Sequence, residues 1–294
     1  MTTDSTPTDE SPVQQGAGSA TAGSAPGLPG EELGDGPAPG QLLSLRGVGK
    51  HFGPVVALDD INLNVAPGKV TALLGDNGAG KSTLIKIIAG IHSSDAGTIY
   101  WEGKPVSLRS PHDSTALGIA TVYQDLALCD NLDIVANMFL GEEVGRFGII
   151  NEAPMERKAR ETLKSLSVTS VRSIRQPVGS LSGGQRQGVA VARAVMADAR
   201  LVIMDEPTAA LGVSQTGVVI DLIRRLAASG VAVFVISHNL NDVYAVADSI
   251  AILFLGRLVV QGSATEIDRQ DAVAFMTLGS AAVNDGARAV APTG

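Results

Sequence analysis

A glycine-rich stretch early in the chain narrows the choice of fold at once. Gly75-Asp-Asn-Gly-Ala-Gly-Lys81-Ser82 follows the apolar run Val70–Leu74 and opens a helical pattern that continues to Ala89. In a strand–loop–helix context, glycines let successive backbone N–H groups approach phosphate oxygens at a helix N-terminus. The stretch therefore predicts a phosphate-binding loop, in which Lys81 neutralises the terminal phosphates and Ser82 takes one magnesium position.

A second motif, Leu201-Val-Ile-Met-Asp205-Glu206, fits a partner for this loop. Four apolar residues ending in acids place carboxylates at the carboxyl end of a buried strand, where open α/β sheets bind their ligands. We expect Asp205 to hold magnesium and Glu206 to polarise a water for attack on the terminal phosphate. Together the two motifs predict an ATP-hydrolysing α/β domain.

Short apolar runs alternate with helical patterns along most of the chain, which favours parallel strands with helices on both faces. The expected strands are 42–46, 61–65, 70–74, 98–101, 119–123, 201–205, 231–236, 250–255 and 257–261. The expected helices are 81–89, 155–167, 185–197, 213–228 and 240–247. The stretch from about 131 to 180 breaks this rhythm and is typical of a helical insert.

The two ends of the chain differ in composition from the middle. Residues 1–40 contain eight glycines and six prolines without apolar periodicity, so we expect a disordered extension, with a regulatory or docking tail as the alternative. Residues 280–294 have a similar composition, which predicts a flexible tail. One folded domain is therefore expected over 41–279.

Charge and hydropathy exclude several classes of protein. The net charge is −8, but six acids precede Arg46, and the remainder carries 24 acidic against 22 basic residues. A nearly neutral body without a basic cluster is not expected to bind nucleic acid. The longest apolar runs stop after about six residues, so we expect no membrane-spanning helix. The N-terminus lacks a signal peptide's pattern, and a single cysteine, Cys129, suits a reducing cytosol.

A third motif, Leu181-Ser-Gly-Gly-Gln185, precedes a helical pattern and predicts either a second anion-binding helix N-terminus or a simple capping turn. Phe52, Gln124 in Val-Tyr-Gln-Asp and His238 in Ile-Ser-His-Asn complete an ordered set. From about Leu42 to Leu278 the chain resembles the nucleotide-binding domain of an ABC transporter. The resemblance implies a P-loop NTPase fold with a mixed-sheet core, an N-terminal antiparallel β-subdomain and a helical subdomain at about 131–195.

The resemblance also implies a role for each motif residue. ATP would be bound by Gly75, Asp76, Asn77, Gly78, Ala79, Gly80, Lys81, Ser82 and Thr83, with Phe52 stacking on adenine and Val56 packing beside it. Magnesium would be held by Ser82, Gln124 and Asp205. Catalysis would fall to Glu206, to His238, which orients Glu206, and to Gln124, which reaches the attacking water. Leu181, Ser182, Gly183, Gly184 and Gln185 would contact the ATP held by a second copy.

One departure narrows the subgroup. Many family members read Ser-Ala-Leu-Asp after the second motif, whereas this chain has Ala209-Ala-Leu-Gly212, so the usual aspartate is absent and communication across the dimer through that side chain is in doubt. The variant is similar to the ATP-binding subunits of monosaccharide importers for fructose, ribose and xylose. Many of those proteins fuse two ATPase domains, and this chain resembles the single-domain kind.

The resemblance therefore implies an ATPase subunit for import of a simple sugar, at the cytoplasmic face of the cell membrane. Its expected cofactors are ATP and Mg²⁺. Its expected partners are a second ATPase subunit in a homodimer or pseudo-dimer, separate permease subunits and, indirectly, a periplasmic or extracellular solute-binding protein. The alternatives are import of amino acids or peptides, export, a soluble ABC ATPase acting on ribosomes or DNA, and a non-catalytic ATP binder. The presence of Glu206 and His238 argues against the last of these.

Overall fold

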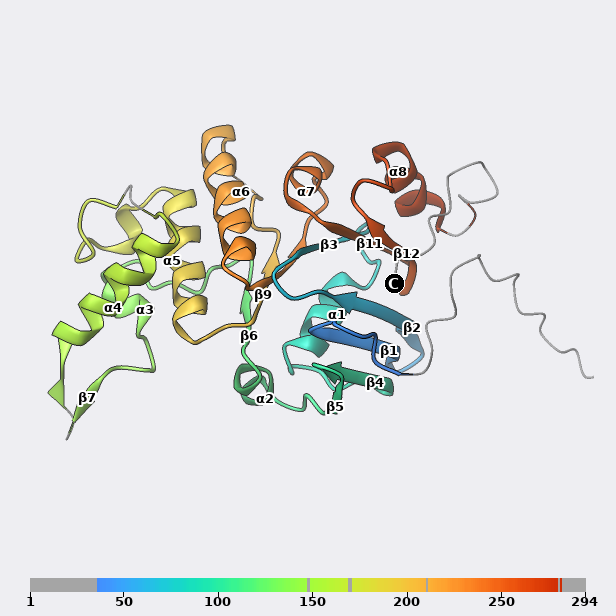
Figure 1. Ribbon diagram of the computed structural model, residues 1–294, viewed down its shortest axis with the longest axis horizontal. Helices are drawn as coiled ribbons and strands as arrows, with labels where there is room; N and C mark the ends of the chain where they lie inside the picture. The colour runs from blue at the N-terminus through green and yellow to red at the C-terminus, as the bar shows by residue number, and fades with distance from the viewer. Residues whose placement is uncertain (1–35, 147–148, 169–170, 210, 280, 282–294) are drawn as a thin grey trace, which may run out of the picture.

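The computed structural model describes residues 36–146, 149–168, 171–209, 211–279 and 281 of the chain (Figure 1). Nearly all of the predicted extension at 1–40 and of the predicted tail at 280–294 lies outside these residues. The rest folds around a large sheet, a smaller antiparallel sheet and a helical lobe. This is the α/β arrangement with a mixed sheet that the family resemblance implies.

The large sheet has six strands in the order β12-β11-β3-β10-β9-β6. Neighbouring strands from β11 to β6 pair in parallel. The outermost strand, β12, pairs antiparallel to β11. Strands β3 and β10 are buried along their whole length, which explains their unbroken apolar sequences. The bounds are β3 (Val70–Leu74), β6 (Ile119–Val122), β9 (Leu201–Asp205), β10 (Ala232–Ile236), β11 (Ser249–Phe254) and β12 (Arg257–Ser263).

Helices cover both faces of this sheet (Figure 1). Three of them, α6 (Val213–Ala228), α7 (Leu240–Val246) and α8 (Arg269–Leu278), lie along one face. Helix α1 (Lys81–Ile88) lies on the other, between the two sheets, and its apolar side chains share one hydrophobic cluster with both. The predicted bounds of α6, β3 and β9 match those of the structure.

The smaller sheet is antiparallel, in the order β2-β1-β4-β5. The predicted strands 42–46 and 61–65 are only parts of a longer hairpin, because the far end of this hairpin exposes Val55 and Val56 and therefore lacks a buried apolar run. The short helix α2 was not predicted; proline at its first position and a Ser110 capping box start it. The bounds are β1 (Leu43–Phe52), β2 (Val55–Val65), β4 (Ala96–Trp101), β5 (Lys104–Val106) and α2 (Pro111–Ala116).

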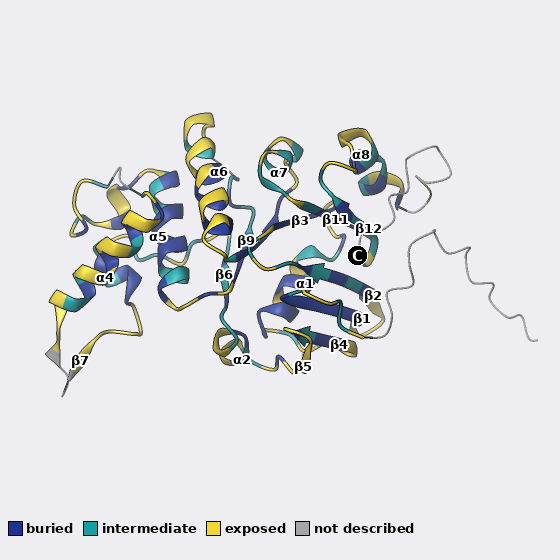
Figure 2. Ribbon diagram, in the orientation of Figure 1, coloured by how far each residue is buried: buried dark blue, intermediate teal, exposed yellow. Residues whose placement is uncertain are grey.

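The helical lobe lies at the opposite end of the molecule from the smaller sheet (Figure 1). Its helices turn buried faces inward and exposed faces outward, as Figure 2 shows by colour. The lobe contains α3 (Ile134–Met138), β7 (Gly145–Arg146), β8 (Ile149–Ile150), α4 (Glu152–Ser165), a 3₁₀ turn (Val178–Ser180) and α5 (Gly183–Met196). The division into subdomains at about 131–195 stays a prediction.

Among the residues that the structure describes, no helix combines the length and the apolar character that crossing a membrane requires.

Candidate functional site

Four of the motifs meet at one edge of the large sheet. In the neighbouring strands β3, β10, β9 and β6, the carboxyl ends lead into Gly75, His238, Glu206 and Gln124, respectively. Because these strands are parallel, their carboxyl ends lie side by side and form the edge at which α/β sheets bind ligands. Segments that are far apart in the sequence are therefore brought to one place by strand order alone.

The phosphate-binding loop requires glycine at two positions. Gly75 has a φ of +154°, and a Cβ there would lie 2.5 Å from the Leu253 carbonyl oxygen. Gly80, the N-cap of α1, has a φ of +107°, and its Cβ would lie 2.8 Å from the carbonyl oxygen of Ala57. Both positions combine a conformation that favours glycine with a close backbone neighbour. The loop is thus held tightly between β2 and β11, with the first turn of α1 directly behind it.

Lys81 lies inside this loop. Its Nζ donates to the carbonyl oxygens of Gly75 at 2.8 Å and Asp76 at 3.0 Å. Partial burial lowers the pKa of Lys81, and the charges of Glu206, Asp76 and Asp205 act in the opposite direction. The ammonium group is therefore partly shielded from water and surrounded by carboxylates. The oxygens of a bound phosphate could replace its carbonyl partners.

Asp205, at the carboxyl end of β9, is half-buried beside this lysine. Burial raises the pKa of its carboxyl group, the adjacent charge of Glu206 raises it further, and Lys81 and Lys86 lower it. A nearby cation would stabilise the charged form of a carboxylate in this setting. The structure thus places Asp205 at the expected strand end, with oxygen atoms suited to a hard divalent ion.

Glu206 and His238 form a direct contact. The Nδ1 atom of His238 lies 2.8 Å from Oε1 of Glu206, whose side chain is only 17% exposed. Glu206 has a φ of +49°, a left-handed conformation that non-glycine residues seldom adopt, and its N–H donates to the Ile236 carbonyl oxygen at 2.9 Å. Backbone strain of this kind is typical of functional positions. The pair was predicted from the resemblance, and the structure brings it together.

Gln124 is exposed two residues after β6, and its neighbours Tyr123 and Asp125 line a groove of about 470 Å³ between the sheet and the helical lobe. The groove is lined by β6, by the stretch after Gln124 and by faces of α2, α3 and α5, including Pro111, Tyr123, Leu126, Met138, Leu140 and Ala190. The site at the sheet edge and this groove therefore share the segment that carries Gln124.

Phe52 ends β1 and is 44% exposed. The His92 ring meets it edge-on with centroids 5.4 Å apart, and the Lys50 ammonium lies 5.5 Å from its centroid. Val56, also exposed, is the second residue of β2 in the same hairpin, one residue before the Ala57 carbonyl that borders Gly80. An exposed, oriented ring beside the phosphate loop suits a planar base.

The structure does not place residues 181–185, the signature segment, at this sheet edge. They begin α5 in the helical lobe, where Ser182 and Gln185 form a capping box: the Ser182 N–H donates to Gln185 Oε1 at 2.9 Å, and the Gln185 N–H to Ser182 Oγ at 3.4 Å. The capping turn and a helix N-terminus suited to an anion are thus the same segment.

The packing behind this segment was not predicted from the sequence. A Cβ on Gly183 would lie 2.5 Å from Leu211 Cδ2 and 3.0 Å from Gln215 Oε1. Leu211 and Gln215 flank Gly212, so the stretch after β9 packs directly against the start of α5. The signal was available in the sequence, because small residues at 183 and 184 allow such a close approach.

Comparison with known proteins agrees with this geometry. Residues 58–209 match the ABC transporter family. The chain is 46% identical to the fructose import ATP-binding protein FrcA of Rhizobium meliloti, over 80% of this chain and 94% of that protein. It is also 46% identical to the xylose/arabinose import ATP-binding protein XylG of Sulfolobus acidocaldarius, with the same coverage. A ribose import ATP-binding protein of Chromobacterium violaceum is 40% identical, but the match covers only 46% of its length.

Solved structures show the same fold. The ADP conformation of MJ1267, an ATP-binding cassette of an ABC transporter, aligns with a TM-score of 0.70 and 28% identity over 78% of this chain and 96% of that one. CbiO1 from Clostridium perfringens, part of an ABC transporter complex, aligns with a TM-score of 0.68 and 25% identity over 83% of this chain and 98% of that one. The chain belongs to the ABC transporter family, as one of its ATP-binding, ATP-hydrolysing cassettes.

Proposed function

We propose that this ATPase powers the import of a monosaccharide through separate membrane permease subunits. The observation that carries the ATPase part is the meeting of the phosphate loop, Asp205, Glu206 and His238 at one sheet edge. The sugar part is supported by the likeness to fructose and xylose/arabinose import proteins over 94% of their length. The sugar itself has no need to touch this chain.

In this proposal, Glu206 accepts a proton from the water that attacks the γ-phosphate. The 2.8 Å contact with His238 keeps the carboxylate pointed at that water, and its low exposure limits competing solvent. Lys81 and the N–H groups at the start of α1 stabilise the charge that develops on the phosphate oxygens. Phe52 and Val56 hold the adenine at the end of the β1–β2 hairpin.

The same residues fit Mg²⁺. The ion prefers oxygen ligands and is usually held by one or two protein groups together with substrate phosphates. Ser82, Gln124 and Asp205 offer such oxygens, and in the part of the chain that the structure describes no cluster of three or more His, Cys, Asp or Glu residues could hold a metal by itself. A site of this composition therefore suits an ion that arrives with ATP. Bound there, Mg²⁺ would neutralise charge on the β- and γ-phosphates.

We further propose that two copies bind ATP between them. The phosphate loop and the signature segment lie on different lobes, one at the sheet edge and one at the start of α5. Each offers N–H groups at a helix N-terminus, where anions are favoured. A head-to-tail dimer would place the signature segment of one copy against the γ-phosphate held by the other copy. Both motif sets would then act in each site.

The groove beside Gln124 is the proposed docking place for the permease. Its lining is largely apolar, and it borders the segment that carries Gln124. A permease segment seated there could therefore respond to the nucleotide through that residue. This proposal places the protein at the cytoplasmic face of the membrane, held by its partners.

A pull-down from membranes tests the proposal. Tagged Glu206→Gln with ATP should recover a polytopic permease and a sugar-type binding protein, identified by mass spectrometry. Leu140→Asp, in the groove, should lose the permease while the isolated subunit still hydrolyses ATP. Leu255→Asp, at a residue that is 73% exposed and does not line the groove, is the matched control and should keep the permease.

Uptake assays then identify the cargo. Cells that lack this chain should take up labelled fructose, ribose or xylose more slowly and amino acids at an unchanged rate. Recovery of an amino-acid binding protein in the pull-down would move the cargo to amino acids. Recovery of ribosomal or DNA-repair proteins would retain the ATPase chemistry and overturn the transport function.

A further inference from the structure

A tight turn connects Gln124 to the helical lobe, and one buried side chain fixes its shape. Asn137 is completely buried. The two N–H groups of its Nδ2 are shared among the carbonyl oxygens of Cys129 at 3.0 Å, Leu132 at 3.2 Å and Asp133 at 3.0 Å, and its Oδ1 accepts the Cys129 N–H at 2.7 Å. A buried amide with these partners leaves the backbone of the 129–133 turn little freedom.

Backbone hydrogen bonds join the 129–133 turn to the stretch that leads into the signature segment. The Val178 N–H donates to the Leu132 carbonyl oxygen at 3.0 Å, and the Gly179 N–H to that of Asp130 at 2.9 Å. A Cβ on Gly179 would lie 3.0 Å from the same Asp130 oxygen, so the two backbones are in close contact. The chain after Gln124 and the chain before the signature segment are thus joined side by side.

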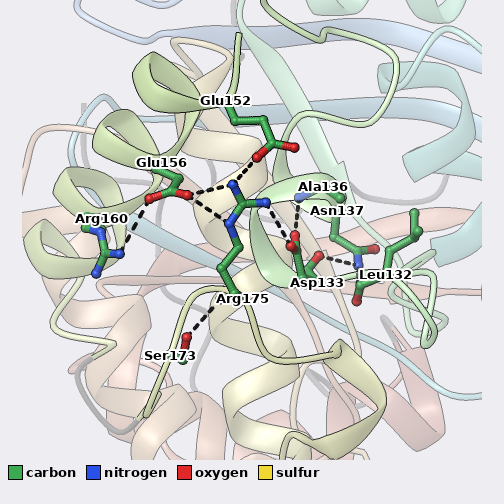
Figure 3. Close-up of polar contacts among 9 residues, drawn as sticks. All are labelled: Leu132, Asp133, Ala136, Asn137, Glu152, Glu156, Arg160, Ser173 and Arg175. Atoms are coloured by element: carbon green, nitrogen blue, oxygen red, sulfur yellow. Dashed lines mark hydrogen bonds and ion pairs between the residues drawn. The ribbon is translucent and has the colours of Figure 1, made fainter. Parts of the chain in front are cut away.

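Arg175 adds side-chain contacts to this junction, between Asp133, Glu152 and Glu156 (Figure 3). Its Nη1 donates to Asp133 Oδ2 at 3.1 Å, its Nη2 to Glu152 Oε2 at 2.5 Å, and its Nε and Nη2 to Glu156 Oε1 at 2.8 and 2.6 Å. Asp133 uses its other oxygen to accept the Ala136 N–H at 2.7 Å, as the N-cap of α3. One guanidinium therefore ties the start of α3 to one face of α4.

The charges in this cluster reinforce each other. The hydrogen bonds that Arg175 donates to Glu156, Asp133 and Glu152, in that order of effect, raise the pKa of Arg175, and the bond to Arg175 lowers the pKa of Glu156. An isolated exposed ion pair contributes little to stability. A guanidinium shared by three carboxylates also fixes the relative positions of the segments that carry them. The cluster is therefore suited to setting a position.

We propose that Asn137 and Arg175 are positioning residues, which bind the segment after Gln124 to the segment before the signature so that both move as one piece. The inference rests on the proposed function, in which the signature segment meets ATP held by a second copy. The phosphate loop packs in a different hydrophobic cluster from α3. Loosening the junction should therefore disturb the signature segment and spare nucleotide binding by one copy.

The test uses Arg175→Gln in the full chain, with Arg160→Gln as the matched control. Arg160 is 62% exposed and contacts the same Glu156 at 3.6 Å, so the control removes an equal charge beside the same carboxylate. We expect Arg175→Gln to lower turnover about tenfold. In the Glu206→Gln background it should raise the subunit concentration needed for ATP-driven dimerisation by about the same factor. A fluorescent ATP analogue should bind the single subunit with affinity changed by less than about twofold.

Two further variants separate positioning from loss of structure. Asp133→Asn keeps an N-cap on α3 and removes the charge that faces Arg175, so its effect should not add to that of Arg175→Gln. Arg175→Lys keeps the charge but lacks the planar fork, and should restore part of the turnover. A purely structural role would lower nucleotide binding, turnover and melting temperature together, and would overturn the inference.

The remaining outcomes distinguish this inference from the proposal on which it rests. If Arg175→Gln and Arg160→Gln match in turnover and dimerisation, the positioning role is wrong and the head-to-tail dimer stands. If Glu206→Gln with Arg175 intact forms no dimer on addition of ATP, the head-to-tail dimer is wrong and the inference is overturned with it.

Discussion

The sheet edge and the helical lobe carry different halves of the proposed ATP site and are held together in different ways. At the sheet edge, position is set by backbone: buried parallel strands and glycines that fit against neighbouring carbonyls. In the lobe, the key helix α3 has only five residues, and side chains fix its surroundings, above all Asn137 and Arg175. A short helix has little stability of its own, so tertiary contacts must supply it.

This difference predicts how the two regions respond to change. A site built from strand ends has little freedom, so substitutions there should act directly on chemistry or phosphate binding. A lobe tied by polar side chains can shift as a body, which is what a segment must do if it meets a second copy only when ATP is bound. The lobe should therefore tolerate substitutions that the sheet edge does not.

The largest expected effect belongs to Glu206→Gln. Removing the proposed base should lower hydrolysis by about 10²–10⁴-fold while ATP affinity is retained, because the phosphate loop is untouched. Phosphate release assays and nucleotide titration measure the two quantities. Glu266→Gln, at an exposed glutamate outside the sheet edge, is the control. Hydrolysis at a wild-type rate would remove Glu206 from the mechanism.

Lys81→Ala should have the second-largest effect on hydrolysis. The loop would lose its fixed cation, so turnover should fall by about 10²–10³-fold. Unlike Glu206→Gln, this variant should also bind ATP more weakly in an equilibrium titration. Lys69→Ala removes a lysine that is 58% exposed and paired with Asp248, and should leave both quantities unchanged. Undiminished hydrolysis would contradict the identification of the phosphate loop.

Gly80→Ala tests the backbone half of the comparison. Its positive φ and the 2.8 Å approach to Ala57 should make the alanine variant less stable by about 1–3 kcal/mol, measured by denaturant unfolding. Gly217→Ala is the control, since Gly217 lies inside α6 without a positive φ and has no neighbour within 4 Å of a Cβ. Equal stabilities for the two variants would mean that the loop is not confined as described.

The smallest expected effect is at Gly212, in the stretch that packs against the start of α5. Gly212 is the N-cap of α6 and provides no side-chain cap, in the place where many family members have aspartate. Gly212→Asp should therefore stabilise the fold by a few tenths of a kcal/mol, seen as a small rise in melting temperature. A large change in turnover instead would show that this side chain governs communication across the dimer.

Much of the sheet edge could be predicted from the sequence, because its elements are continuous in the chain. Strands β3 and β9 and helix α6 have the predicted bounds, since buried parallel strands are unbroken apolar runs and α6 has a clear helical period. The Glu206–His238 contact followed only from the family resemblance, because its residues follow two different strands, 32 positions apart in the sequence.

The lobe was predicted less well, for a physical reason. Helix α3 is too short for a periodic pattern, and α4 begins at Glu152 rather than 155, because its first turn contains a proline and precedes the periodic apolar residues. Arg175 and Asp133 are separated by 42 positions in the sequence, and no local pattern marks their contact. Asn137 carries no apolar signal, although it is completely buried. Such contacts depend on tertiary structure.

The central claim is that ATP is bound between the sheet edge of one copy and the signature segment of another. The most direct test is the mass of purified Glu206→Gln by light scattering, with and without ATP and Mg²⁺. We expect the measured mass to rise with ATP from that of one 30.1 kDa subunit to that of two. The Ser182→Arg variant in the same background should keep the mass of one subunit. A Glu206→Gln protein that remains a single subunit with saturating ATP would contradict the claim.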